Sequence, residues 1–289
     1  MLIHVDVHVL FFSWEGAIGS IAHILFQFLS DDPYDGPLRP SKDVVGSESK
    51  MATTESSTEL YLADQIGFVQ CLEVFGDDLT TANAARVSFD KVSTSLTEGD
   101  KKLIAYLAKH EHTSPFFHPQ VRFRLKMPLF VAREWFRHTI GFARNEVSRR
   151  YVTTGVECWI PAVEDVRERN PTVKQGSKNT PVADAEEVQG MIREQMESAM
   201  RTYESLLEKG VCGEIARAIL PQSMYTEFIE TGSLAAYARL CHLRLGADAQ
   251  KEIREFAKRI SQIMEMAFPV SWKALMKHEV LPPQEQASS

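Results

Sequence analysis

The densest group of charged side chains in the sequence lies between Arg133 and Arg150. This stretch holds five arginines and one histidine against only two acidic residues, Glu134 and Glu146. Arginines that lie close together repel one another, so their density indicates a bound anion. The planar guanidinium group matches a phosphate in two-point contact. The alternative is a solvent-exposed charged turn whose side chains pair with one another.

Two features favour an anion site over a charged turn. Gly141 and Asn145 are turn-forming residues, which places the arginines on a loop directly after an apolar helix, where sites are common. Aromatic residues are interleaved with the cations, as at a site that stacks flat rings; they are Trp135, Phe136, Phe142 and Tyr151.

Ser148 has no His–acid pair beside it, so we expect it to contact a substrate rather than act as a nucleophile.

Composition restricts the class of protein. The chain has 289 residues, of which 44% are hydrophobic and 25% charged, as in ordinary globular proteins. Its formal net charge of −7 disfavours a nucleic-acid-binding role, because neutralising phosphates requires a basic surface. The four cysteines form no C-x-x-C pair, so we expect buried structural thiols and a reducing, cytoplasmic setting.

The sequence divides into one domain and its flanks. Residues 1–50 are interpreted as an extension, which a misplaced start codon would explain, and residues 51–66 as a polar linker. The apolar run from Val9 to Leu29 is diluted by polar residues, so we expect no membrane association. Residues 67–280 are expected to form a single domain, and residues 281–289 a disordered tail.

The hydrophobic pattern predicts an α+β fold, in which a small mixed sheet packs with several helices. Strict alternation predicts a strand over Val121–Met127, and Phe68–Val74 is a second strand. Pro128 then opens a helix that runs to about His138. The polar stretch Asn170–Asp184 is expected to be an exposed loop. Helical periodicity covers Thr80–Val87, Asp100–Lys109, Glu186–Lys209, Gly213–Leu220, Ser233–Leu245 and Asp248–Phe268.

The segment Arg137–Tyr151 resembles the signature of the flavin-dependent thymidylate synthases (the ThyX family). That signature is Arg-His-Arg followed by a Ser and then by Asn-Glu-x-Ser-x-Arg-Tyr. The half from Asn145 onward matches closely. Residues 128–136 also look like the helix that precedes the signature in this family. The resemblance covers about residues 67–275, through stretches in the family's order: Ala84–Asp90, Thr113–Phe116, Glu214–Pro221 and Leu243–Ile253.

The first half of the signature departs from the family. Thr139 stands where the family has its second Arg, and Phe142 or Ala143 stands where it has Ser. The interval between His138 and the Asn of the signature is one residue longer. Arg144 could return the missing positive charge from a different place in the loop. These departures affect the expected flavin contacts more than the nucleotide contacts.

The resemblance implies FAD-dependent reductive methylation of dUMP to dTMP. The carbon donor would be 5,10-methylenetetrahydrofolate, a folate, and the reductant would be NADPH. The family assembles as homotetramers with active sites formed between subunits. The sequence has no G-x-G-x-x-G, so FAD would bind without a Rossmann unit.

Residue roles are carried over by the same resemblance. Arg244 would be catalytic, at the edge of the uracil ring, where a fixed cation stabilises developing negative charge. The residues expected to bind the substrate are Glu134, Arg137, Glu146, Val147, Ser148, Arg149, Arg150, Arg217 and Arg244. The residues expected to bind FAD are Ser88, Ser114, Arg137, His138, Thr139, Glu146, Ser233 and Arg239.

Alternatives remain at this point. The altered loop leaves open a dUMP hydroxymethylase of the same fold, and a non-catalytic nucleotide-binding protein is a second alternative. His110, His112 and His118 are close in sequence, but a metal site needs three or four convergent ligands, and we expect no metal.

Overall fold

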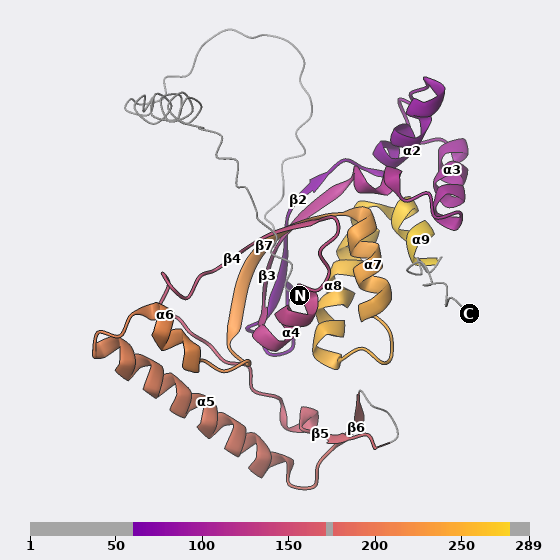
Figure 1. The fold of residues 1–289 in the computed structure, drawn as a ribbon. Helices are drawn as coiled ribbons and strands as arrows, with labels where there is room; N and C mark the ends of the chain where they lie inside the picture. Colours follow the sequence, from indigo (N-terminus) through magenta and orange to yellow (C-terminus); the bar gives the residue numbers. More distant parts are fainter. Residues whose placement is uncertain (1–59, 172–175, 278–289) are drawn as a thin grey trace, which may run out of the picture. The chain divides into compact units, whose positions relative to one another are not determined.

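A five-stranded sheet forms the centre of the part of the chain that the structure describes, residues 60–171 and 176–277 (Figure 1). In this computed structural model the strand order is β1-β2-β3-β7-β4. Every pairing within the sheet is antiparallel, whereas a mixed sheet was expected. The expected α+β class is confirmed. The strands are β1 (Leu60–Tyr61), β2 (Phe68–Phe75), β3 (Gln120–Pro128), β7 (Tyr225–Ser233) and β4 (Phe142–Glu146).

The strand β3 follows from its alternating sequence, as predicted. Its four apolar side chains, from Val121 to Met127, are fully buried. The basic side chains between them face the other way and meet acidic residues of neighbouring segments. Arg122 pairs with Glu73 of β2 at 2.8 Å, and Arg124 pairs with Glu227 of β7 at 2.5 Å. One face of the sheet therefore joins the core and the other is covered by charge pairs.

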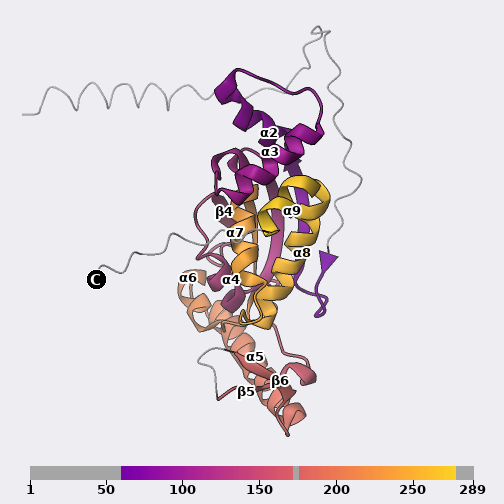
Figure 2. The same ribbon diagram turned by 90° about the vertical axis from the view of Figure 1, so that its right-hand side faces the viewer.

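The apolar face of the sheet is covered by α4 (Leu129–Trp135), α7 (Leu234–Arg244) and α8 (Lys251–Ala267), as the two views of Figures 1 and 2 agree. The predicted stripe on α8 is buried, with Ile253, Ile260 and Met264 inaccessible to solvent. These helices match the helical pattern of the sequence to within a few residues, whereas α9 (Pro269–Lys277) was not predicted.

The helices α2 (Asp78–Arg86), α3 (Glu98–Lys109) and α9 pack together beyond one end of the sheet. Asp78 fixes this packing, because its buried carboxylate accepts hydrogen bonds from the backbone N–H groups of Val270 and Ser271 at 3.0 and 2.7 Å. These groups begin α9 and have no partner within that helix. Two short 3₁₀ turns, η1 (Val87–Phe89) and η2 (Ser114–Phe117), flank α3.

Three sequence expectations are corrected. The segment Asn170–Asp184 is not wholly a loop, because β6 (Ser177–Pro181) lies in it and pairs with β5 (Arg167–Arg169). The expected linker 51–66 contains β1. The strand β4 lies inside the stretch interpreted as a loop, and β7 was not predicted. In a strand as polar as β4, pairing with β7 decides the conformation, and local pattern does not reveal it.

The remaining elements are α5 (Ala185–Glu208), α6 (Gly213–Ala216), and the 3₁₀ turns η3 (Val163–Asp165) and η4 (Arg217–Ile219). All described residues fall in one compact unit that spans Thr54–Ser289. Within that part of the chain, no helix has the length and apolar character needed to cross a membrane. The interpretations of residues 1–50 and 281–289 lie outside the described residues.

The expectation of buried thiols is corrected for three of the four cysteines. Only Cys241 is fully buried, and burial raises the pKa of its thiol. Cys71 and Cys158 are half-buried, and Cys212 is exposed.

Gly232 permits the closest contact between β7 and its neighbours. A Cβ atom there would lie 2.6 Å from the Phe142 ring and 2.7 Å from the Tyr237 ring. We therefore expect Gly232→Ala to lower the free energy of unfolding by about 1–3 kcal/mol through overpacking. Gly190→Ala is the matched control. It lies in α5 with open space around it, so the same change should stabilise by about 0.5–1 kcal/mol. Urea unfolding measures the free energy of unfolding of both variants. An equal change in the two variants would contradict the role given to Gly232.

Candidate active site

A pocket of about 500 Å³ lies where β4 ends, beside β7 and α6. Four of the residues predicted to bind substrate line it: Glu146, Val147, Arg149 and Arg217. Pairing with β7 positions the first two of these. The Thr226 hydroxyl donates to the Glu146 carboxylate at 2.5 Å, and the Val147 N–H donates to the Glu227 carbonyl at 2.9 Å.

The loop after β4 is held by its own backbone and by Arg149. The Ser148 carbonyl accepts from the N–H groups of Tyr151 and Val152, both at 3.0 Å. The Arg149 guanidinium donates to the Thr154 carbonyl at 2.8 Å, and its Nε is buried without a partner among the described residues. The Arg149 side chain therefore shapes this loop, which leaves the backbone of the loop to face the pocket.

Close contact between α6 and this loop brings in Arg217. A Cβ at Gly213 would lie 3.1 Å from the carbonyl oxygens of Arg149 and Arg150, so a larger residue would push α6 away. Arg150 lies beside Ser148, and its Nε is 3.3 Å from the Ser148 hydroxyl oxygen. Its Nη1 lies 3.9 Å from the carboxylate of Glu214. The Arg217 side chain is exposed and forms no hydrogen bond or ion pair with the described residues, so its guanidinium is free to meet an anion.

Arg244, at the end of α7, is fixed at three points by the segment after β3. Its Nε donates to His138 Nε2 at 3.1 Å. Its Nη1 donates to the Glu134 carboxylate at 3.3 Å, and its Nη2 donates to the Glu134 carbonyl at 3.4 Å. A guanidinium has five N–H donors, so two remain available. Glu134 was expected to bind substrate, and the structure places its carboxylate against Arg244.

His138 can accept that hydrogen bond because it is neutral. Burial lowers its pKa to about 4, and the nearby charges of Arg244, Arg144 and Arg239 act in the same direction. The proton of the neutral ring therefore lies on Nδ1, and Nε2 presents its lone pair to Arg244.

The suggestion that Arg144 returns the missing loop charge is wrong. Arg144 forms an ion pair with Glu230 of β7, whose carboxylate is completely buried. Trp135 Nε1 lies 3.2 Å from both oxygens of the same carboxylate. A buried carboxylate is costly without such partners, so Arg144 belongs to the core and not to the exposed loop.

The residues predicted to bind FAD separate into exposed and buried groups. Arg137 and Thr139 are exposed, as are Ser88 in η1 and Ser114 in η2. Ser233 is only 3% exposed, and its hydroxyl caps α7 by accepting from the Ala236 N–H at 3.2 Å. A flavin contact through the Ser233 side chain is therefore not supported.

The loop before β4 is packed onto the start of α7. Arg239 donates to the Ile140 carbonyl at 2.6 Å. Gly141 has a positive φ of 82°, and a Cβ there would lie 2.8 Å from the Ser233 hydroxyl. The longer interval in the signature is therefore accommodated by a tight glycine turn.

Two groups of predicted residues lie toward opposite ends of β3. Ser114 precedes the Gln120 end, whereas Glu146 contacts Thr226, which pairs with Met127 near the other end. Seven residues of strand separate Gln120 from Met127, or about 23 Å. Figure 1 shows α3, which η2 follows in the chain, and α6 beyond opposite ends of the sheet.

The sequence missed the residues that complete the pocket. Leu129, Met224 and Thr226 line it from α4 and from the start of β7. No signal pointed to the last two, because β7 was not predicted. His110 and His112 pack their rings against Tyr106 at the end of α3, with centroids 4.3 and 6.1 Å from the Tyr106 ring. No group of residues that could hold a metal ion occurs among residues 60–171 and 176–277.

Comparison with known proteins identifies the family. The family model described as "Thymidylate synthase complementing protein" matches residues 71–270. A flavin-dependent thymidylate synthase of Thermus thermophilus is 39% identical over 212 residues, covering 73% of this chain and 76% of that protein. The enzyme of the same name from Thermosipho africanus is 38% identical over 214 residues, covering 73% and 91%.

A solved structure agrees. The UMP/dUMP methylase PolB from Streptomyces cacaoi, bound with 5-Br dUMP, superposes with a TM-score of 0.66 at 28% identity, covering 73% of this chain and 95% of that one. The chain is thus an enzyme, and it belongs to the family of flavin-dependent thymidylate synthases.

Proposed function

We propose that this enzyme catalyses the FAD-dependent reductive methylation of dUMP to dTMP, with 5,10-methylenetetrahydrofolate as carbon donor and NADPH as reductant. The observation that carries the proposal is the pocket in which Glu146, Val147 and Arg217 meet. The names of the relatives support a flavin and a uracil nucleotide.

The pocket suits a nucleotide monophosphate. Arg217 and Arg150 would bind the phosphate. The Arg217 side chain has no partner among the described residues, and the polar contacts of the Arg150 side chain are long, 3.3 Å to the Ser148 hydroxyl and 3.9 Å to Glu214. Glu146 and Ser148 offer an acceptor and a hydroxyl for the sugar or the base edge. In the loop after β4, the backbone N–H groups of Ser148 and Arg149 have no partner among the described residues and would add two donors.

Arg244 would act on the uracil ring. Its two remaining donors can face a ring carbonyl and stabilise the negative charge that develops when the ring is activated. A cation that is already fixed needs no reorganisation during the reaction, which is the main source of electrostatic catalysis. Its anchors are Glu134 and neutral His138, which are positioning residues in this scheme.

The exposed donors fit FAD in part. Arg137 and the hydroxyls of Thr139, Ser88 and Ser114 are suited to phosphates and sugar hydroxyls, and Arg239 adds a cation behind the loop. Bound FAD would supply the redox and one-carbon chemistry, and the protein would bind and orient the reactants. Because these donors and the nucleotide pocket lie toward opposite ends of β3, we propose that homotetramer subunits share each site.

The altered loop leaves a hydroxymethylated product as a second candidate. Thr139 replaces a cation next to the expected flavin position, so a dUMP hydroxymethylase is the second candidate. The likeness to a UMP/dUMP methylase also makes UMP a substrate to test beside dUMP.

Anaerobic turnover tests the function directly. Purified protein supplied with FAD, dUMP, methylenetetrahydrofolate and NADPH should form dTMP, identified by mass. Arg244→Ala should keep the flavin absorbance and lose turnover by about a hundredfold or more, because it removes the charge-stabilising group. Lys258→Ala on the exposed side of α8 is the control. A hydroxymethyl product, protein that stays colourless with FAD, or full activity of Arg244→Ala would each overturn part of the scheme.

Glu134 should affect the rate more than substrate binding. Glu134→Ala removes one anchor of Arg244, so we expect kcat to fall by about tenfold while KM for dUMP changes little. Glu134→Gln retains an oxygen acceptor and should recover most of the rate. Steady-state kinetics at saturating FAD measure this, with Glu187→Ala on α5 as control. A rise in KM at unchanged kcat would instead make Glu134 a substrate contact.

His138 should make stability depend on pH in one window. Its folded-state pKa of about 4 lies below the usual 6.5, so the unfolded chain takes up a proton that the folded chain refuses. The stability of the folded state is therefore complete above pH 6.5 and decreases as the pH falls from 6.5 toward 4. Urea unfolding across this window should show the loss, and His138→Gln should show less of it. An equal loss in both proteins would contradict the assignment.

A further inference from the structure

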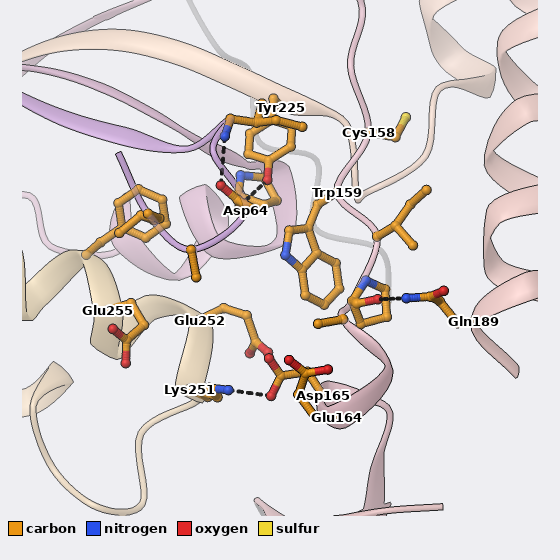
Figure 3. Close-up of a pocket in the computed structure, with 18 of the residues that line it drawn as sticks. Asp64, Cys158, Trp159, Glu164, Asp165, Gln189, Tyr225, Lys251, Glu252 and Glu255 are labelled. Carbon is orange, nitrogen blue, oxygen red and sulfur yellow. Dashed lines mark hydrogen bonds and ion pairs between the residues drawn. The ribbon is translucent and has the colours of Figure 1, made fainter. Parts of the chain in front are cut away.

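A second cavity, of about 620 Å³, lies on the other side of the first residues of β7 (Figure 3). Its walls come from the turn between β1 and β2, from residues 158–165, from α5 and from the first turns of α8. None of the residues assigned above to the nucleotide or to FAD line it. Its volume lies within the range of small-molecule sites.

An aromatic side chain stands at the centre of this cavity. Figure 3 shows the Trp159 indole between the Asp64–Tyr225 pair above it and the carboxylates of Glu252 and Asp165 below it. Phe130 packs edge-on against the indole, with ring centroids 5.2 Å apart. Trp159 is held in this orientation and remains half-buried, so part of its surface is open to a ligand.

The lining is acidic. Five carboxylates meet only two basic side chains, Lys251 and Arg193, for a formal net charge of −3. Part of this charge is compensated: Lys251 pairs with Asp165, and Arg167 behind the wall donates to Glu252 Oε1 at 2.7 Å. Anionic ligands such as phosphates and dinucleotides would be repelled from this cavity.

One carboxylate of the lining is open to a ligand. Glu164 is exposed, and no hydrogen bond or ion pair ties its carboxylate to the described residues. The Glu252 carboxylate is not open in this way, because Arg167 holds its Oε1 and its Oε2 has almost no accessible surface. A ligand with N–H donors would therefore meet Glu164, whereas a neutral apolar ligand would leave that acceptor unused.

We propose that this cavity is a binding site for a flat organic cation of the amidine or guanidine class. Such a group donates two parallel hydrogen bonds to a carboxylate and stacks on an indole, which matches Glu164 and Trp159. The site is separate from the nucleotide pocket but shares a wall with it. Tyr225 points into the cavity, whereas its neighbours Met224 and Thr226 line the nucleotide pocket.

Calorimetric titration of the full-length protein with benzamidine tests the proposal. We expect saturable binding of one molecule per chain. Benzamide, its neutral analogue, should bind about tenfold more weakly or worse, and benzoate should show no binding, because the wall is acidic. Comparable affinities for benzamidine and benzamide, or no saturable benzamidine binding, would overturn the proposal.

Two variants locate the site. Trp159→Leu and Glu164→Gln should each weaken benzamidine binding by about tenfold, through loss of the indole and of the charge respectively. The Glu164 carboxylate has no partner among the described residues, so Glu164→Gln preserves the wall if Trp159→Leu disturbs folding. Glu265→Gln, the same change on the exposed side of α8, is the matched control and should bind as the parent does. Unchanged binding in Glu164→Gln would overturn the proposal.

Discussion

The antiparallel pairing of β7 with β3 on one edge and β4 on the other determines where the groups of the candidate site lie. Through β4, this pairing sets the Glu146 carboxylate against the Thr226 hydroxyl and starts the loop that carries Ser148 and Arg150. Successive side chains of a strand face opposite sides, so the same few residues of β7 line the nucleotide pocket on one side and the acidic cavity on the other. The two sites are therefore separated only by the thickness of one strand.

The buried carboxylate of Glu230 explains why Arg144 of the signature segment points into the core. Glu230 lies in the middle of β7 with no solvent exposure, and its carboxylate is stabilised by Arg144 and Trp135. Arg144 is therefore unavailable to the loop surface. The same arginine contributes to the low pKa of His138, which keeps that ring neutral and able to accept from Arg244. One buried carboxylate thus links the core of the sheet to the orientation of the proposed catalytic group.

The sequence predicted the elements whose signal is local. The alternation from Val121 to Met127 and the stripe on α8 each record burial of one face, and both predictions are confirmed. The strands β4 and β7 were missed because their polar residues, such as Glu230 and Arg144, are stabilised by partners far away in the sequence. Strand formation there depends on pairing rather than on pattern.

The site residues divide in the same way. Motif resemblance located Glu146, Val147, Arg149 and Arg217, which the structure gathers in one pocket. It could not reveal that the Arg149 side chain would turn back to the Thr154 carbonyl, or that Ser233 would cap a helix. These side-chain contacts depend on which hydrogen-bonding groups remain unpaired after folding, and the sequence alone does not show those groups.

The placement of the remaining donors favours a site shared between copies of the chain. Ser88 and Ser114 are exposed on 3₁₀ turns toward one end of β3, and the nucleotide pocket lies toward the other, with about 23 Å of strand between Gln120 and Met127. A uracil ring must touch both the flavin and Arg244 in the proposed reaction. Groups toward the two ends of β3 cannot converge by a small movement, because the pairing of β3 with β2 and β7 holds the strand along its length. A second copy that presents its own 3₁₀ turns to the pocket removes the difficulty without any change in the fold.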